Sequence, residues 1–167
     1  MKIKTVGLIR NILFACVCIS FVVGLVLSIE ADKERKHNPD NILVTIEDSR
    51  ASLSDNKFFV YVDYEITNRT DVELKYVDLK TYIEDENGRL LGTLTTTFGS
   101  TYSVSNSLSL GSKKSMVKTS YVSESVYWLD EGDMLYEIYK NGLDSYNLRC
   151  EITAAAWSDD YKWSSTK

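Results

Sequence analysis

The segment Lys57–Asn68, KFFVYVDYEITN, is the part of this sequence that most constrains its fold. Large apolar and aromatic side chains recur at every second position along one side of it: Phe58, Val60, Val62, Tyr64 and Ile66. Because successive side chains of a β-strand point to opposite faces, this alternation predicts a strand with one buried face. A single strand cannot bury such a face alone, so a second layer of sheet or helix must cover it.

Other segments after residue 41 carry the same alternation and predict further strands, at 42–48, 74–84, 89–97, 115–122 and 146–156. Turn residues separate them, most clearly Asn87-Gly88, because this pair favours the positive φ angles of a tight hairpin. Phe98–Lys114, rich in Ser, Gly and Thr, is either a loop or a weak edge strand. We therefore predict an all-β domain over residues 42–157, built as a two-sheet antiparallel β-sandwich. A polar tail, 158–167, is expected to follow.

One short segment of this domain is ambiguous. Asp133 is a suitable N-cap, Gly142 is a suitable C-terminal stop, and the apolar residues between them recur at helical spacing. A strand fits the same residues nearly as well, so the conformation of Asp133–Asn141 stays open.

Asn11–Ile29 is uncharged and mostly apolar. As a helix, these roughly 19 residues at about 1.5 Å each would extend about 28 Å, close to the thickness of a bilayer's hydrocarbon core. We interpret the segment as one transmembrane helix acting as an uncleaved signal anchor. Residues 1–10 then form a short basic cytoplasmic tail, and 30–41 form a charged linker. Basic residues are equally frequent on both sides of the segment, and the short amino-terminal tail favours a domain outside the cell membrane.

Alternatives to an uncleaved anchor stay open. A secretory signal peptide could be cleaved after Ala31. Leu13-Phe14-Ala15-Cys16 is similar to a lipoprotein cleavage motif, although uncharged residues continue well beyond Cys16. Cys16 and Cys18 are also candidates for reversible palmitoylation, although buried cysteines in an apolar segment are commonly inert.

The charge of the chain is unevenly distributed. Of its 19 basic residues, Lys2, Lys4 and Arg10 precede the apolar segment, whereas all 24 acidic residues follow it. The remainder therefore carries 16 basic against 24 acidic groups, a net charge of −8. An acidic domain repels phosphate backbones, so nucleic acid is not expected as a partner.

Few residues in the domain are suited to catalysis or metal binding. His37 is the only histidine and lies in the linker, where we expect a solvated side chain, so histidine-based triads and metal sites are excluded. Cys150, the only cysteine after the apolar segment, is expected to be a buried core thiol. The acidic run 130–133 lacks the spacing of a known calcium loop. We predict no enzyme activity, no cofactor and no metal.

Asn68-Arg69-Thr70 matches an N-glycosylation sequon, but the residue types around it indicate a turn asparagine.

Two stretches resemble a known family. YVDYEITN (Tyr61–Asn68) and VDLKTYIEDENGRLLGT (Val77–Thr93) are similar to telokin-like, FxLYD-type immunoglobulin-like domains of membrane-anchored proteins and lipoproteins of Gram-positive bacteria. The chain differs in having Thr81-Tyr82-Ile83-Glu84-Asp85 where the family's name motif has Leu-Tyr-Asp. The resemblance implies an immunoglobulin-like antiparallel β-sandwich that acts as an extracellular interaction or spacer module. It brings no catalytic residues.

Aromatic side chains are the only unusual feature of the sequence that is suited to binding a partner. Exposed rings can form a surface for a protein partner or stack against sugars. The candidate interaction surface comprises Tyr61, Tyr82, Trp128, Trp157 and Trp163. We expect a non-catalytic, membrane-anchored interaction or structural module, with the partner and the oligomeric state undefined. A carbohydrate-binding module is the alternative, which an open, coplanar row of these rings would favour.

Overall fold

The computed structural model describes residues 2–99 and 108–165. The chain divides into two compact units, Met1–Lys36 and His37–Lys167, which are described separately below. The short alternation at Tyr102 and Val104, within the segment expected to be a loop or an edge strand, lies outside the described residues.

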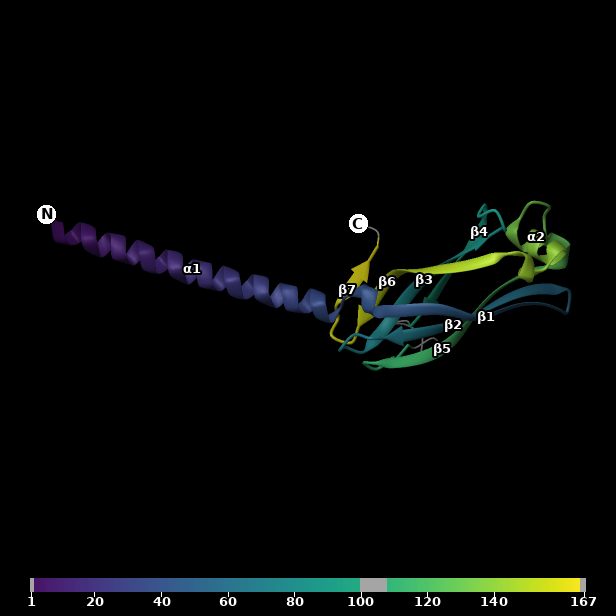
Figure 1. The fold of residues 1–167 in the computed structure, drawn as a ribbon, viewed down its shortest axis with the longest axis horizontal. Helices are drawn as coiled ribbons and strands as arrows, with labels where there is room; N and C mark the ends of the chain where they lie inside the picture. Colours follow the sequence, from purple (N-terminus) through teal and green to yellow (C-terminus); the bar gives the residue numbers. More distant parts are fainter. Residues whose placement is uncertain (1, 100–107, 166–167) are drawn as a thin grey trace. The chain divides into compact units, whose positions relative to one another are not determined.

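The first unit is a single helix, α1, from Lys2 to Lys36 (Figure 1). The large apolar side chains described on it, from Phe14 to Ile29, are between 48% and 72% exposed. In the last turns, Asp32 forms ion pairs with Arg35 at 2.8 Å and with Lys36 at 2.7 Å. Much of the predicted charged linker is therefore a continuation of this helix.

Among the described residues, none of the helices combines the length and the apolar character needed to cross a membrane. This finding contradicts the transmembrane helix predicted over Asn11–Ile29.

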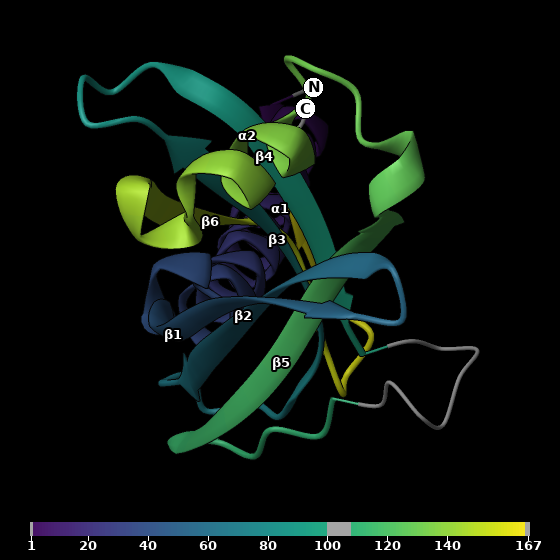
Figure 2. The same cartoon turned by 90° about the vertical axis from the view of Figure 1, so that its right-hand side faces the viewer.

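The second unit consists mainly of two antiparallel sheets facing each other (Figures 1 and 2). One sheet has the strand order β1-β2-β5, with bounds Ile42–Ser54, Lys57–Asn68 and Lys114–Ser125. The other has the order β4-β3-β6-β7, with bounds Leu90–Phe98, Leu74–Glu84, Asn147–Trp157 and Lys162–Ser164. The prediction of a mostly β fold with two antiparallel sheets is confirmed.

The inner faces of β2 and β3 form the centre of the core. All the alternating apolar residues predicted to point inward from β2 are buried, as are Val77, Leu79 and Ile83 on β3. The hydroxyl groups of Tyr64 and Thr81 lie 2.7 Å apart and join the two sheets by a buried hydrogen bond. Burial raises the pKa of Tyr64, so the neutral phenol that makes this bond persists well into the alkaline range.

Bulges in β1 and β6 reverse which residues point inward along these strands. In β1, Glu47 has no pairing partner on β2. Before Glu47 the even-numbered residues Val44 and Ile46 point inward, and after it the odd-numbered residues of β1 do. In the pairing of β6 with β3, the register shifts between Asp78 and Leu79 of β3. Beyond this shift, the residues of β6 that point inward and are buried are Ala155 and Trp157.

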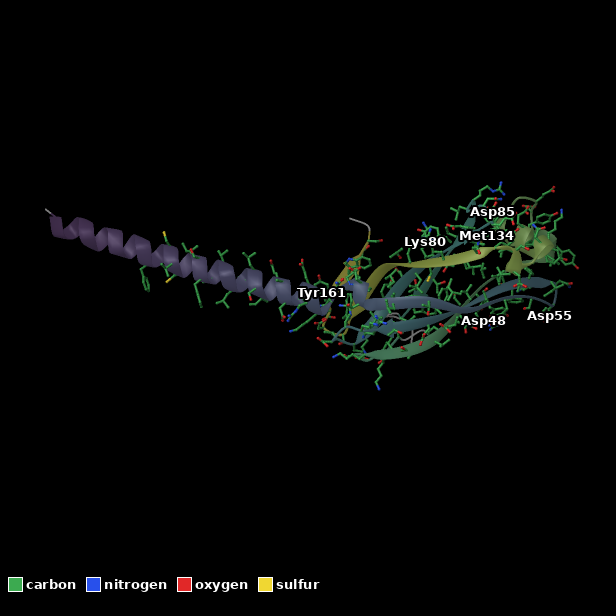
Figure 3. All side chains as sticks on the ribbon, viewed as in Figure 1. Asp48, Asp55, Lys80, Asp85, Met134 and Tyr161 are labelled. Atoms are coloured by element: carbon green, nitrogen blue, oxygen red, sulfur yellow. The ribbon has the colours of Figure 1, made fainter. Side chains whose placement is uncertain are left out.

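A short helix covers one end of the second unit. Helix α2, Met134–Asn141, follows the 3-10 turn η3 (Val126–Trp128) and precedes the 3-10 turn η4 (Leu143–Ser145). It lies at the same end as the β1–β2 hairpin, whose tip carries Asp55 (Figures 1 and 3). Ile138 and Leu143 pack there against Phe58, Val60 and Ile83 in a second apolar cluster. The ambiguous segment is therefore helical.

His37 opens the second unit and is not solvated as predicted. The 3-10 turn η1 (Pro39–Asn41) follows it and leads into β1. The His37 ring is only 2% exposed, stacks on Tyr161 with centroids 4.4 Å apart, and meets Trp157 edge-on at 5.3 Å. Its Nε2 atom lies 2.8 Å from Asp159 Oδ2. Its ring partners are more than one hundred residues away in sequence, so local composition gave no sign of them.

The described part of the predicted polar tail, up to residue 165, belongs to the fold. Its residues 162–164 form strand β7, which pairs with Ala154–Ala156 of β6. Cys150, on the inner side of β6, packs against the core, and burial raises the pKa of its thiol. A raised pKa disfavours the nucleophilic thiolate, consistent with the predicted core role.

Candidate functional site

The five aromatic residues predicted as an interaction surface do not lie together. Trp157 is only 2% exposed, and its indole Nε1 donates a hydrogen bond to Thr70 Oγ1 at 3.1 Å. Trp163 is half-buried against the core, whereas Trp128 on η3 is 75% exposed. The prediction is therefore wrong for Trp157, which the bulge in β6 turns inward.

Tyr61 and Tyr82 point outward from different sheets. Tyr61 alternates with the buried residues of β2, and Tyr82 with those of β3, so the two rings lie on opposite outer faces of the sandwich. The labelled side chains of Asp48 and Lys80 mark these two faces in Figure 3. No single partner surface of modest size can include both tyrosines.

On the outer face of the β1-β2-β5 sheet, Tyr61 belongs to a different group of rings. Phe59 and Tyr61 have centroids 5.8 Å apart and nearly parallel planes, at 15°. Tyr121, directly opposite Tyr61 on β5, lies 5.8 Å from Tyr61 and 6.1 Å from Phe59. It is 64% exposed. We call Phe59, Tyr61, Tyr121 and the neighbouring Arg50 the aromatic patch.

Arg50 is held over this patch by ionic contacts. Its guanidinium lies 5.1 Å from the centre of the Tyr61 ring, within the range of a cation–π contact. Arg50 Nη1 also donates to Asp63 Oδ2 at 2.6 Å and to Asp48 Oδ2 at 3.3 Å. Hydrogen bonds from Thr119 and Arg50 lower the pKa of Asp63, so the carboxylate that positions Arg50 stays ionised at neutral pH.

The opposite outer face carries a more polar group around Tyr82. Arg149 lies 4.2 Å from the centre of the Tyr82 ring, and Lys80 lies 5.2 Å from it. The Tyr82 hydroxyl donates to Glu151, and Arg149 pairs with Glu84 at 3.4 Å. Tyr82 is thus occupied by its own neighbours, which leaves less ring surface for a partner.

Two of the three rings in the aromatic patch, and Arg50 beside them, were not predicted as site residues. Phe59 was placed correctly on the outer side of its strand but was not chosen as a site residue. Tyr121 was assigned to a strand, yet only the register that pairs it with Tyr61 brings the two rings together. The register between β2 and β5 depends on residues far apart in the sequence, so the contact of Tyr121 with Tyr61 could not be predicted. The alternation along β2, in contrast, already indicates that Phe59 and Tyr61 point outward side by side.

The fold and this patch define a two-layer antiparallel β protein with an aromatic outer face. No protein-family model matches the chain, and none of the curated proteins does.

Among solved structures, the chain is similar to a Bordetella pertussis protein provisionally assigned as ApaA, with 12% identity and a TM-score of 0.41. That match covers 73% of this chain and 84% of the other. It is also similar to the structural-genomics target SoR45, with 12% identity, a TM-score of 0.43, and coverage of 74% and 80%. Similarity at this level carries no argument about function.

Proposed function

We propose that this chain is a non-catalytic interaction module that is associated with the cell membrane and acts outside the cell. Its second unit would be an immunoglobulin-like sandwich of the telokin-like, FxLYD-type group, as the sequence resemblance implies. The aromatic patch is the observation that carries this proposal. It combines three rings and a guanidinium, the kinds of side chain that most often dominate protein–protein interfaces.

The patch is suited to a protein partner because its members are already held in place. Arg50 is fixed by Asp63 and Asp48, and the three rings rest on neighbouring positions of two paired strands. Side chains that are ordered before binding lose less conformational entropy in the complex. A partner that covers the patch would therefore gain from burying ring surface at a reduced entropic cost.

We expect the Phe59→Ala/Tyr61→Ala double variant to lose partner binding at least about tenfold, because aromatic hot-spot residues typically contribute a few kcal/mol. The measurement is quantitative cross-linking on cells that produce the protein, followed by mass spectrometry of the captured partner. The matched control is Tyr82→Ala on the opposite face, which should leave capture unchanged. Equal capture by the double variant and the wild type would refute the role of the patch.

Association with a membrane rests on the helix α1. Its described apolar side chains between Phe14 and Ile29 are exposed, and they are distributed around the helix rather than along one stripe. A helix that is apolar all round needs an apolar environment, and a membrane provides one. We propose the segment Asn11–Ile29 as the part of the chain that binds the membrane.

We expect the protein to stay in the membrane fraction after washing with alkaline carbonate, and protease added to intact cells to remove the second unit. The reason is that about ten large apolar side chains, each contributing roughly 1.5–3 kcal/mol on burial, outweigh any electrostatic attachment. Replacing Val22 and Leu25 by Lys should release the protein, whereas replacing them by Ile should not. Release of the wild type by carbonate, or full protection from protease, would contradict this assignment.

Carbohydrate binding is a second candidate, favoured by one observation. The nearly parallel rings of Phe59 and Tyr61, beside Tyr121, offer more than one ring on the same open face. The predicted row of tryptophans does not support it, since Trp157 is buried. A glycan array probed with the full-length protein separates the two candidates, because only a carbohydrate-binding module would retain specific glycans in a manner that depends on Tyr61.

A further inference from the structure

The outer face of the β1-β2-β5 sheet continues beyond the aromatic patch into a region of carboxylates. Asp63 and Glu65 follow Tyr61 at every second position of β2, so the three side chains leave the same face of the sheet. On β1, Asp48, which is labelled in Figure 3, is paired with Asp63, and Glu47 precedes it at the bulge. We call Glu47, Asp48, Asp63 and Glu65 the acidic region.

The acidic region has fewer basic partners than carboxylates. Among the described residues only Arg50 forms ion pairs with it, at 2.6 Å to Asp63 and 3.3 Å to Asp48. Glu65, which is half-buried, forms no hydrogen bond or ion pair with any residue that the structure describes. The outward base of β2, Lys57, lies at the opposite end of the strand. The acidic region therefore keeps an excess of negative charge.

Exposed side chains of β5 extend the apolar part of this face toward Glu65. Tyr121 lies opposite Tyr61, Val117 lies opposite Glu65, and the two are 64% and 59% exposed. Four positions of a strand correspond to about 13 Å, at about 3.3 Å per residue. A partner on this face therefore meets ring surface at one end and, about 13 Å away, a carboxylate beside an apolar side chain.

Charge complementarity selects the partner for this face. An acidic side chain over Glu65 would be repelled, and an uncharged apolar one would remove water from the carboxylate without replacing its hydrogen bonds. A lysine or arginine gives an ion pair, and its aliphatic stem can lie against Val117 while the charged end reaches Glu65. A second copy of this face carries the same excess of negative charge, so two copies would repel each other face to face.

We propose that the outer face of the β1-β2-β5 sheet binds a basic segment of a partner protein. An aromatic or aliphatic side chain of that segment packs against Tyr61 and Tyr121, and a lysine or arginine pairs with Glu65. The inference rests on the interaction function proposed above and names the chemistry of the partner. Because the opposite charges attract before contact, association is faster at low salt.

The test selects peptides from a random twelve-residue library, displayed on phage, with the full-length protein in a mild nonionic detergent. Peptides whose binding is lost in Tyr61→Ala are assigned to this face. We expect these peptides to carry a net positive charge and at least one aromatic or aliphatic side chain. Biolayer interferometry should show binding at least about fivefold weaker in about 0.5 M salt than in about 0.05 M salt, because the higher concentration shortens the screening length to roughly 4 Å.

Two substitutions of Glu65 remove the expected ion pair. Glu65→Gln keeps the size of the side chain and should weaken peptide binding about threefold or more, chiefly through slower association. Glu65→Lys repels the basic peptide and should weaken binding at least about tenfold. The matched control, Glu86→Lys in the exposed β3–β4 turn, alters the net charge equally and should leave binding within about twofold. Thermal unfolding checks that each variant is folded, and Glu65→Gln carries the test if Glu65→Lys is not.

Selection of neutral or acidic peptides, binding that does not respond to salt, or equal binding by Glu65→Lys and Glu86→Lys would overturn this inference. So would a library that yields no peptide dependent on Tyr61. Self-association of the protein that is lost in Tyr121→Ala would assign the face to a second copy and also overturn it. Partner capture on cells that depends on Phe59 and Tyr61, but not on Glu65, would leave the proposed function intact while this inference fails.

Discussion

Asn68→Ala should lower the free energy of unfolding by about 3–5 kcal/mol, since it removes several buried hydrogen bonds at once. Asn68 is the last residue of β2 and is fully buried. Its Nδ2 donates to the carbonyl oxygens of Val72 at 2.8 Å and Leu110 at 3.0 Å. Its Oδ1 accepts from the Thr70 backbone N–H at 3.0 Å and from the Thr70 hydroxyl at 2.6 Å.

The reason for so large an effect is that the partners stay buried when the amide is removed. Thr70 is itself buried and accepts from the indole of Trp157, so the network joins three distant parts of the chain. An unsatisfied buried polar group costs about 1–3 kcal/mol, and alanine at position 68 leaves more than one.

Urea denaturation followed by tryptophan fluorescence measures this loss, with Asn87→Ala as the matched control. Asn87 lies in the exposed β3–β4 turn, so the same substitution there should change stability by about 0.5 kcal/mol or less. Similar losses in the two variants would show that the network around Asn68 does not stabilise the fold.

Gly99→Ala should also be severely destabilising, by about 3 kcal/mol or more, because it combines backbone strain with a collision. Gly99 has φ +88°, a conformation that side chains disfavour. A Cβ atom there would lie 2.1 Å from the carbonyl oxygen of Lys75 and 2.9 Å from Tyr76 Cα. Both are backbone atoms of β3, so neither can move without disturbing the strand.

Gly132→Ala separates the two causes. Gly132 has a similar φ of +95°, but an added Cβ would meet no atom within 4 Å. That variant should therefore lose only about 1 kcal/mol, which reflects strain alone. Thermal unfolding of the two variants measures the free energy that each loses. An equal loss of stability in both would mean that β3 shifts to accommodate the extra methyl group without cost.

The alternation along the chain predicted most of the strands because it reports which face of a sheet is buried. β2 and β3 begin and end where the pattern predicted. β1 continues to Ser54, well beyond the predicted end, because residues 49–54 are held by pairing with β2 rather than by an apolar face. The bulges in β1 and β6 are invisible to a pattern with a fixed period of two, so the burial of Trp157 was missed.

The candidate site was less predictable than the fold. Tyr61 was identified from its outward position, but its neighbours Tyr121 and Arg50 come from strands whose register the sequence does not reveal. The ionic contacts of Arg50 with Asp63 likewise depend on pairing between β1 and β2. The order of the strands within each sheet is likewise left undetermined by the alternation.

The environment of Asn68 bears on how this chain can be modified. A glycan is attached through the side-chain nitrogen of the sequon asparagine, and that nitrogen already donates to the carbonyl oxygens of Val72, Leu110 and Gly111. An oligosaccharide at this position would have to displace strands from each other before it could reach solvent. A secretory host that glycosylates such sequons would therefore have to act on the nascent chain before it folds, and a sugar-bearing product would be a misfolded one.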